Sequence, residues 1–548
     1  FKIEHHIRLK NIFLRFNKNI KNILGYCGYS ACFRNIYGGN MIRTKPKIAI
    51  VTFTDDRDVG VSSKEVENYL RKKQEELKDF LLKNNIEVID PLSEIRSTGD
   101  DWYGLRKIND VRKTCEILKI QNADGILIGA WTWAPPMLII EFLRQINLPL
   151  MYYSENNPMN GGLSQFLATG AGLMEWGVNK HALRHERNFG DRETIVKWAK
   201  SMHAVKQMQE SALLLWGGSY AVKMEHLQDD IPKLKTFLIR DILTEDQYVL
   251  VNRADKILKN QFGRITKFLN WIKTNGLEIK FDDKMLTENA FNKQIALLIA
   301  ARDRLKDLKD ENIRGVSIKC QPDIYFEYGV DACTLPTFLP FAFNEDGEQD
   351  IYPTVCEGDI KGLLTSLILL LINQEVPPAF GDLISVEDDY IEFGNCGGHS
   401  LFWASNSLNS KEALSRTKAI ANIHGVSGAA FSFFSNSADK ITAARLTRIK
   451  GKYYMQFGVG RALDAERCLK SKLGNSLDTH LGCVWGKNVI DLGVKADNFV
   501  KVFGANHLHV TLGDISEELE YFCRELDIPF VRLDSDSDME KFYNSVRN

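Results

Sequence analysis

Short apolar runs alternate with amphipathic helical patterns over residues 46–154. A β-branched run at 47–53 and the short runs at 86–90, 123–131 and 149–154 predict strands, and helical patterns fall between them at 64–82, 111–121 and 141–145. This alternation is typical of βαβ units, which build a parallel sheet with helices on both faces. No strand is followed by GxGxxG, so we do not expect a dinucleotide-binding domain.

A second α/β unit follows, and then the pattern changes. Strands are expected at 213–218, 316–325 and 351–356, with a charged helical stretch at 245–309 and an apolar run at 363–372. That run is about half the length that a bilayer requires, so it predicts a buried core helix. Beyond residue 383 the runs 442–448, 452–460, 499–503 and 507–512 predict short strands, with one clear helix at 516–526. Strands with few helices between them favour an antiparallel domain or barrel.

The predicted fold is therefore α/β: two Rossmann-like domains with parallel sheets, then a β-rich, barrel-like C-terminal domain. We place the domains at 41–205, 206–382 and 383–548. Residues 1–40 form a basic leader in which Glu4 is the single acid. A transit peptide or a surface helix would have this composition. We favour a start at Met41 and exclude the leader from the native fold.

Composition narrows the classes of function. The formal net charge is −1, so no overall field attracts nucleic acid or an anionic membrane, and we expect neither as a partner. The ten cysteines include no CxxC pair, which fits reduced thiols in a cytoplasmic protein better than disulfides or a zinc site.

Acidic residues gather in segment 351–382. Glu357 and Asp359 follow the predicted strand 351–356, and Asp382 follows a glycine. Open α/β sheets bind ligands at the carboxyl edge of their strands, and neighbouring carboxylates repel one another unless a cation or a proton compensates. One interpretation is a divalent metal site with Glu357 and Asp382 as ligands. The alternative is that these acids cap the following helix.

Several motifs, in order, resemble the L-fucose isomerase family: PKIAIVTFTDDRDVG, LLLWGGSY, VCEGDIKG, ITAARLTRIKG and VFGANHLHVTLG. The resemblance runs from Pro46 to the C-terminus. It implies two α/β domains followed by a β-rich domain, assembly as a homo-oligomer (a trimer or hexamer), and Mn²⁺-dependent conversion of an aldose into its ketose. Mg²⁺ or Co²⁺ are the alternative cations.

The resemblance also implies the residues of the site. The metal ligands would be Glu357, Asp382 and His507, with Asp388 or Asp389 as alternatives to Asp382. Glu357 and Asp382 would be the catalytic carboxylates that move protons, and which of them is the base stays open.

Further expectations concern the sugar. Trp131 and Trp133 would pack on it from a neighbouring subunit, or else belong to the core or an interface. The other substrate-binding candidates are Ser219 and Tyr220 after the double glycine, His399 in a glycine-rich loop, and Asn506 beside His507. Lys223, if it faces the pocket, would indicate an acidic group on the substrate.

The function expected is a metal-dependent aldose–ketose isomerase that uses an enediol mechanism. Its substrate would be a deoxyhexose or a pentose (L-fucose, D-arabinose or L-arabinose), or a modified hexose such as a sulfonated sugar. The competing classes are a non-catalytic sugar-binding protein and a metal-dependent sugar epimerase or dehydratase.

Overall fold

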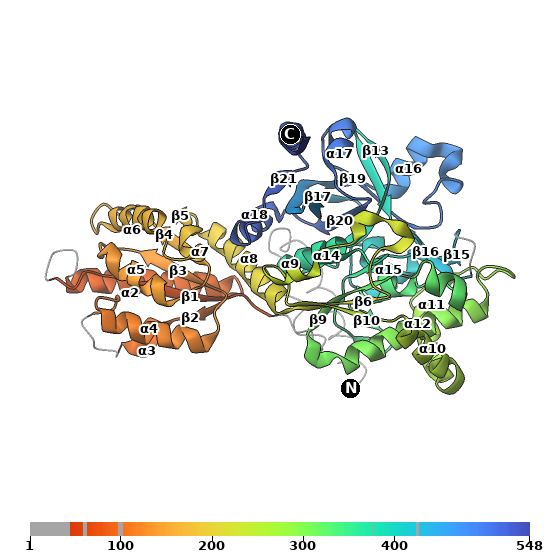
Figure 1. Ribbon diagram of the computed structural model, residues 1–548, viewed down its shortest axis with the longest axis horizontal. Coiled ribbons are helices and arrows are strands. Elements are labelled where there is room, and N and C mark those ends of the chain that lie inside the picture. The colour runs from red at the N-terminus through yellow and green to blue at the C-terminus, as the bar shows by residue number, and fades with distance from the viewer. Residues whose placement is uncertain (1–43, 58–62, 97–101, 375, 424–426, 548) are drawn as a thin grey trace, which may run out of the picture.

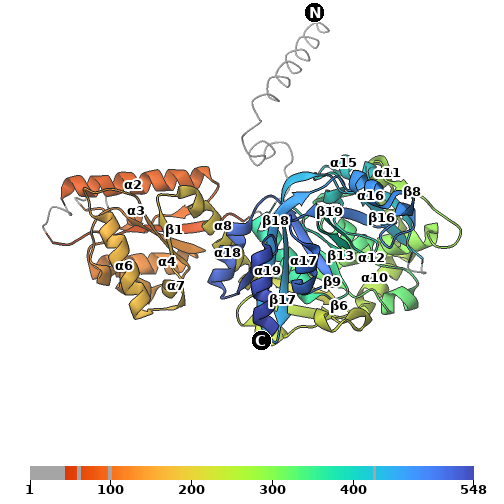
Figure 2. The same ribbon diagram turned by 90° about the horizontal axis from the view of Figure 1, so that it is seen from above.

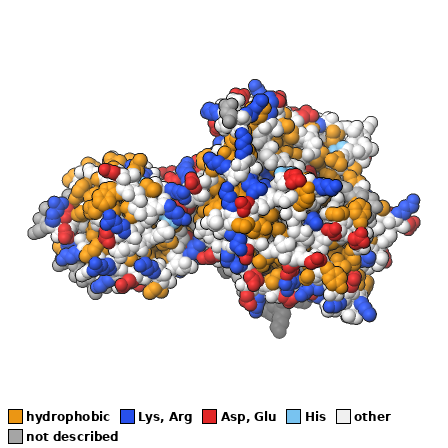
Figure 3. Space-filling view, viewed as in Figure 1, with side chains coloured by type: hydrophobic (Ala, Val, Ile, Leu, Met, Phe, Trp, Pro, Cys, Tyr) orange, Lys and Arg blue, Asp and Glu red, His pale blue; other side chains and the backbone are white. Residues whose placement is uncertain are grey.

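The computed structural model describes residues 44–57, 63–96, 102–374, 376–423 and 427–547. The predicted leader, 1–40, lies outside the described residues. The molecule has two lobes: the N-terminal α/β domain forms one, and the remaining chain forms the other (Figure 1). The space-filling view shows a narrow waist between them, with charged side chains of both signs scattered over both lobes (Figure 3).

The N-terminal lobe is a five-stranded parallel sheet in the order β2-β1-β3-β4-β5. Every residue of β3 and β4 is buried, as expected for strands covered by helices on both faces. The strands are β1 (Lys47–Thr52), β2 (Glu87–Ile89), β3 (Gly125–Ala130), β4 (Leu150–Ser154) and β5 (Glu186–Phe189). The helices are α2 (Lys64–Lys83), α3 (Pro91–Ile95), α4 (Ile108–Gln121), α5 (Pro136–Gln145), α6 (Gly162–Trp176) and α7 (Lys180–Leu183).

Helix α8 (Arg192–Glu210) joins the lobes and packs beside α18 (Ser516–Glu525) (Figure 2). Ser201 Oγ donates to the Glu518 carbonyl at 2.9 Å, and Lys197 pairs with Glu517 at 2.9 Å. The predicted boundary at 205/206 falls inside this helix.

The second sheet has four parallel strands in the order β12-β9-β6-β7. They are β6 (Ala212–Trp216), β7 (Asp241–Glu245), β9 (Ile313–Ile318) and β12 (Thr354–Cys356). The accompanying elements are α9 (Ile231–Lys235), α10 (Tyr248–Asn260), α11 (Phe262–Thr274), α12 (Glu288–Asp307), α13 (Thr334–Phe338), and the short strands β10 (Phe343–Asn344) and β11 (Gly347–Glu348). The predicted strand 316–325 is wrong beyond Ile318, because Pro322 has no N–H for a ladder and a π-helix, Ile324–Tyr328, follows.

Helix α14 (Ile360–Ile372) confirms the predicted core helix. All of its residues are buried, and it packs against β9 and β12 on one side and β17 and β20 on the other (Figure 1). Within the described ranges, no helix combines the length and apolar character needed to cross a membrane.

The third sheet is a ten-stranded, mainly antiparallel sheet that closes on itself, because β18 pairs with both β17 and β19. Its order is β21-β18-β17-β20-β13-β14-β19-β16-β15-β8. The predicted barrel-like domain is thereby confirmed. The strands are β8 (Glu278–Ile279), β13 (Ala379–Glu387), β14 (Tyr390–Gly394), β15 (Lys418–Ala421), β16 (Ala429–Phe434), β17 (Ala438–Ile449), β18 (Lys452–Ala462), β19 (Gly486–Asp491), β20 (His507–Leu512) and β21 (Phe530–Arg532).

One predicted strand of this domain is a helix. Residues 499–503 belong largely to α17 (Ala496–Val502), in which Phe499 and Val502, three positions apart, are buried. The remaining helices are α15 (Ser410–Ser415), α16 (Ala465–Leu473) and α19 (Asp536–Arg547). The predicted boundary after Asp382 falls inside β13, so Asp382 lies in the barrel sheet.

Candidate metal and sugar site

The three predicted metal ligands lie together where the second α/β domain faces the barrel. Glu357 follows β12, while Asp382 on β13 stands directly opposite His507, the first residue of β20. His507 Nε2 lies 3.3 Å from Glu357 Oε2 and 3.5 Å from Asp382 Oδ1. Residues separated by up to 150 positions thus share one site, which we call the Glu357–Asp382–His507 triad.

Neither alternative to Asp382 reaches the triad. Asp389 is exposed in the turn between β13 and β14 and pairs with Lys472 at 2.7 Å. Asp388 accepts a hydrogen bond from the Ala496 amide at 2.8 Å. The antiparallel register therefore selects Asp382 as the partner of His507.

The backbone that presents Glu357 is unusual. Glu357 has φ of +69° and Gly358 has φ of +70°, and the Glu357 amide donates to the Ile318 carbonyl at 2.9 Å. A Cβ at position 358 would run into the Gly218 carbonyl oxygen and Ser219 Cα. Only glycine fits there, and left-handed backbone at a non-glycine residue is a form of strain that gathers at functional sites.

Asp359 contacts the triad through His507. Its carboxylate caps α14 through the Gly362 amide at 2.9 Å and pairs with the buried Arg445 at 2.6 and 2.9 Å. It also lies 2.7 Å from His507 Nδ1. Because an ionised carboxylate only accepts, Nδ1 carries the proton that faces Asp359, which leaves Nε2 to face Glu357 and Asp382. The helix-capping interpretation thus applies to Asp359.

The charges of this cluster are tightly linked. Burial favours neutral Asp359, but Arg445 and His507 outweigh burial and hold the pKa of Asp359 well below its usual range. Burial raises the pKa of Asp382, with a further contribution from Glu357. Burial opposes a charge on His507, yet Asp382, Asp359 and Glu357 raise the pKa of His507 to about 10. The excess of negative charge therefore attracts positive charge to the position of His507 Nε2.

The donor set suits a hard divalent cation. Glu357 Oε2 and His507 Nε2 are buried, and neither has a hydrogen-bond partner among the described residues. Two carboxylates and one imidazole are ligands that Mn²⁺ and Mg²⁺ accept. Neighbouring ligands on an octahedral ion with bonds of ~2.1 Å are about 3.0 Å apart. The two distances from His507 Nε2 to the carboxylate oxygens are a few tenths of an ångström longer than this. Among the described residues, no group of three or more His, Cys, Asp or Glu side chains is already close enough to hold a metal ion.

Two predicted substrate-binding residues border the triad. Gly218 and Ser219 abut Gly358, and the Ala221 amide donates to the Glu357 carbonyl at 3.2 Å. Asn506 Nδ2 donates to Asp382 Oδ1 at 2.6 Å. Ser219 and Asn506 therefore lie beside the two catalytic candidates.

Tyr220 and Lys223 belong to the same loop as Ser219. The Tyr220 hydroxyl donates to Glu225 Oε1 at 2.8 Å. Lys223 is exposed, with φ of +62°. The acidic substrate group expected from Lys223 stays a prediction.

His399, Trp131 and Trp133 contact other parts of the described chain. His399 is fully buried in the barrel against Phe433, with Nε2 2.8 Å from Asn488 Nδ2, and burial lowers the pKa of His399 to about 4. Trp131 is 2% exposed in the core of the N-terminal domain and donates to Gln74 Oε1 at 3.1 Å. Trp131 therefore occupies the core position that was its alternative. Trp133 is half-buried in the same domain, and its contact with a neighbouring subunit's sugar stays a prediction.

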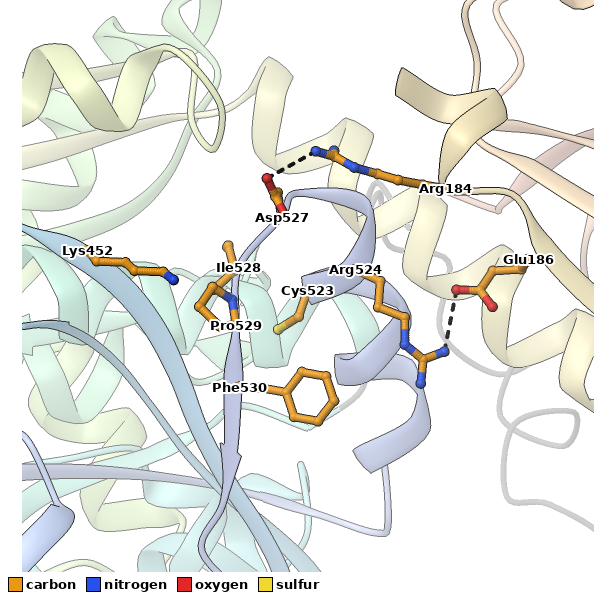
Figure 4. Close-up of a pocket in the computed structure, with 9 residues that line it drawn as sticks. All are labelled: Arg184, Glu186, Lys452, Cys523, Arg524, Asp527, Ile528, Pro529 and Phe530. Atoms are coloured by element: carbon orange, nitrogen blue, oxygen red, sulfur yellow. Dashed lines mark hydrogen bonds and ion pairs between the residues drawn. The ribbon is translucent and has the colours of Figure 1, made fainter. Parts of the chain in front are cut away.

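A groove of about 550 Å³ lies at the waist, where the N-terminal domain meets α18 and β21 (Figure 4). Arg184 pairs with Asp527 at 3.3 Å across it, and Arg524 pairs with Glu186 at 3.4 Å. Two ion pairs thus cross the groove between the lobes, and its lining includes no residue of the triad. The groove is therefore part of the interface between the two lobes.

Sequence reasoning missed Arg445 and His226, and gave Asp359 only the alternative role of a helix cap. Arg445 neutralises Asp359, while His226 Nε2 lies 2.8 Å from Asn506 Oδ1. Nothing local marks either residue, because their partners lie 86 and 280 positions away. The local signal for Asp359 was its position in the CEGD motif, two residues after Glu357.

Comparison with known proteins agrees with this picture. Residues 393–534 match the family model of the L-fucose isomerase C-terminal domain, which confirms the predicted resemblance. The chain is 24% identical over 432 residues to the sulfoquinovose isomerase of Priestia aryabhattai, covering 77% of this chain and 88% of that protein. It is 21% identical over 428 residues to the sulfoquinovose isomerase of Alkalicoccus urumqiensis, covering 75% and 86% respectively.

Proposed function

We propose that this chain is a metal-dependent aldose–ketose isomerase, because residues 393–534 match the family model of the L-fucose isomerase C-terminal domain. The names of the relatives support a sulfonated deoxyhexose of the sulfoquinovose type as the substrate class. The observation that carries the proposal is the triad, in which two carboxylates and an imidazole converge and two buried ligand atoms make no hydrogen bond within the described chain.

The residues that would hold the cation are Glu357, Asp382 and His507. When bound, a divalent cation polarises the carbonyl and hydroxyl oxygens of the open-chain sugar and offsets the negative charge that develops there. Mn²⁺ is the expected ion, with Mg²⁺ or Co²⁺ as alternatives.

The protein's own groups move the protons. One carboxylate, Glu357 or Asp382, takes the proton from C2 while the other carboxylate or a water gives a proton to O1, and an enediol results. The enediol then returns the proton on O2 to that second group, and the first carboxylate gives its proton to C1, which yields the ketose. Asp359 fixes the tautomer of His507, and Asn506 holds Asp382 by a hydrogen bond.

Turnover of a panel of aldoses with Mn²⁺ in D₂O tests this function, with sulfoquinovose, L-fucose and D-arabinose read by NMR. We expect a ketose with deuterium at C1, loss of activity on chelation and recovery on adding Mn²⁺. An epimerase would label the epimerised carbon and give no ketose. Failure to convert any of these aldoses, or an undiminished rate after chelation, would refute the proposal.

Substitutions locate the chemistry. Glu357→Gln and His507→Ala should each lower kcat by at least ~10³-fold, because each removes a ligand of the proposed site. Asp389→Asn is the matched control, since it removes an exposed carboxylate of the same segment that pairs with Lys472. Equal losses in all three variants would show that the triad has no special role.

A further inference from the structure

A chain of hydrogen bonds leads from loop 217–228 into the triad. His226 Nε2 lies 2.8 Å from Asn506 Oδ1, and Asn506 Nδ2 donates to Asp382 Oδ1 at 2.6 Å. That same oxygen, Asp382 Oδ1, lies 3.5 Å from His507 Nε2. A residue of the second α/β domain thus reaches, through one amide, the carboxylate of the barrel strand.

The direction of these bonds follows from the chemistry of the groups. An ionised Asp382 can only accept, so the NH₂ of Asn506 must face it. The carbonyl oxygen of Asn506 then faces His226, and Nε2 of His226 must carry a proton to donate. Without that donor, Asn506 keeps its bond to Asp382 Oδ1 and its contact with Met224 Sδ at 3.9 Å but loses the partner of its carbonyl oxygen, so the orientation of its amide beside Asp382 is less constrained.

The loop that carries His226 is itself held under strain. Tyr220, Val222 and Lys223 have φ of +74°, +52° and +62°, and Val222 is β-branched. Such backbone persists only where surrounding contacts maintain it. The contacts here are Ala221 to the Glu357 carbonyl, and Lys361 Nζ to the Gln228 carbonyl at 2.9 Å. The loop is therefore fixed at both ends beside the triad, with His226 between them.

We propose that His226 is a positioning residue, which orients Asn506 so that Asp382 stands at the correct place to bind the cation. This inference rests on the proposed function. His226 does not need to touch the sugar. Outer hydrogen-bond partners of metal ligands typically change metal affinity or activity by about 10–100-fold when they are removed.

The test compares His226→Ala, His226→Gln and the wild-type chain. Mn²⁺ affinity is measured by electron paramagnetic resonance of free Mn²⁺, and kcat and KM are measured separately. His226→Ala should weaken Mn²⁺ binding by about 10-fold or more and lower kcat. His226→Gln should stay within about threefold of wild type, because its side-chain amide can donate to Asn506 Oδ1. His185→Ala is the control, since His185 is also half-buried but lies in the N-terminal domain.

The outcomes separate the two proposals. A His226→Ala variant that melts earlier but binds Mn²⁺ like the wild type would show a merely structural role and overturn the inference. A Gln variant as weak as the Ala variant would overturn the donor argument. If the wild-type chain itself neither binds Mn²⁺ nor converts an aldose, the proposed function fails, and this inference fails with it.

Discussion

Replacing Asp359 by Asn separates the charge of this residue from its other roles. Asparagine still caps a helix well, so the bond from the Gly362 amide to position 359 can persist. What disappears is the negative charge facing Arg445 and His507. The variant therefore isolates the electrostatic support of the triad.

The expected loss of stability follows from burial. Arg445 and Asp359 are both fully buried and joined by two hydrogen bonds, at 2.6 and 2.9 Å. Removing one partner of a buried ion pair costs about 3–5 kcal/mol, because the remaining charge stays desolvated and unopposed. The total free energy of unfolding of a natural domain is only about 5–15 kcal/mol. Asp359→Asn should therefore be among the most damaging single changes in this domain.

Urea unfolding of the metal-free protein measures this cost, with circular dichroism as the signal. Arg445→Met and the double variant complete a double-mutant cycle. We expect the double variant to regain part of the loss, since neither charge is then buried alone. Mn²⁺ affinity should also fall by about 10–100-fold in Asp359→Asn, because His507 Nδ1 loses its carboxylate. A single variant within ~0.5 kcal/mol of wild type would refute the reasoning.

Two further changes test the surroundings of the site. Gly358→Ala should lower the free energy of unfolding by about 1–3 kcal/mol and remove most of the activity, because the alanine methyl group would meet the backbone of residues 218 and 219. Gly493→Ala is the control, since Gly493 has φ of +68° and nothing within 4 Å of an added Cβ. It should lower the stability less and leave turnover unchanged. Burial lowers the pKa of Lys487 from 10.5 to about 8, so the unfolded state binds more protons between those values and stability should rise from pH 8 to 10.5, by up to ~3 kcal/mol. Lys487→Met should abolish that rise in a pH series of urea unfolding; a wild type and variant with the same slope would contradict the burial argument.

Much of the architecture could be predicted from local pattern. Strands β1, β3 and β4 are short, almost wholly buried runs, and α14 is an apolar run too short for a bilayer. Such segments have one stable environment, the core, so their sequence nearly determines their structure. The run at 499–503 misled because aromatic and β-branched residues also suit a helix whose positions i and i+3 face the core.

The site was predictable only in part, for a physical reason. The CEGD and GANH motifs resemble a known family, and this drew attention to Glu357 and His507. The contacts that orient them depend on register between distant strands, as with Asp382 opposite His507. A sequence shows which residues could pair, but only packing decides that Arg445 reaches Asp359 and that His226 reaches Asn506.

The residues of the triad lie on both sides of the point where the family match begins, at residue 393. Residues 393–534 contain His507, but Glu357 and Asp382 precede them. A polypeptide trimmed to the matched segment would keep the imidazole and lose both acids. Chimaeras made by exchanging that segment between relatives would consequently inherit their cation site from two parents, and each new join would have to restore the register between β13 and β20 before any ion could bind.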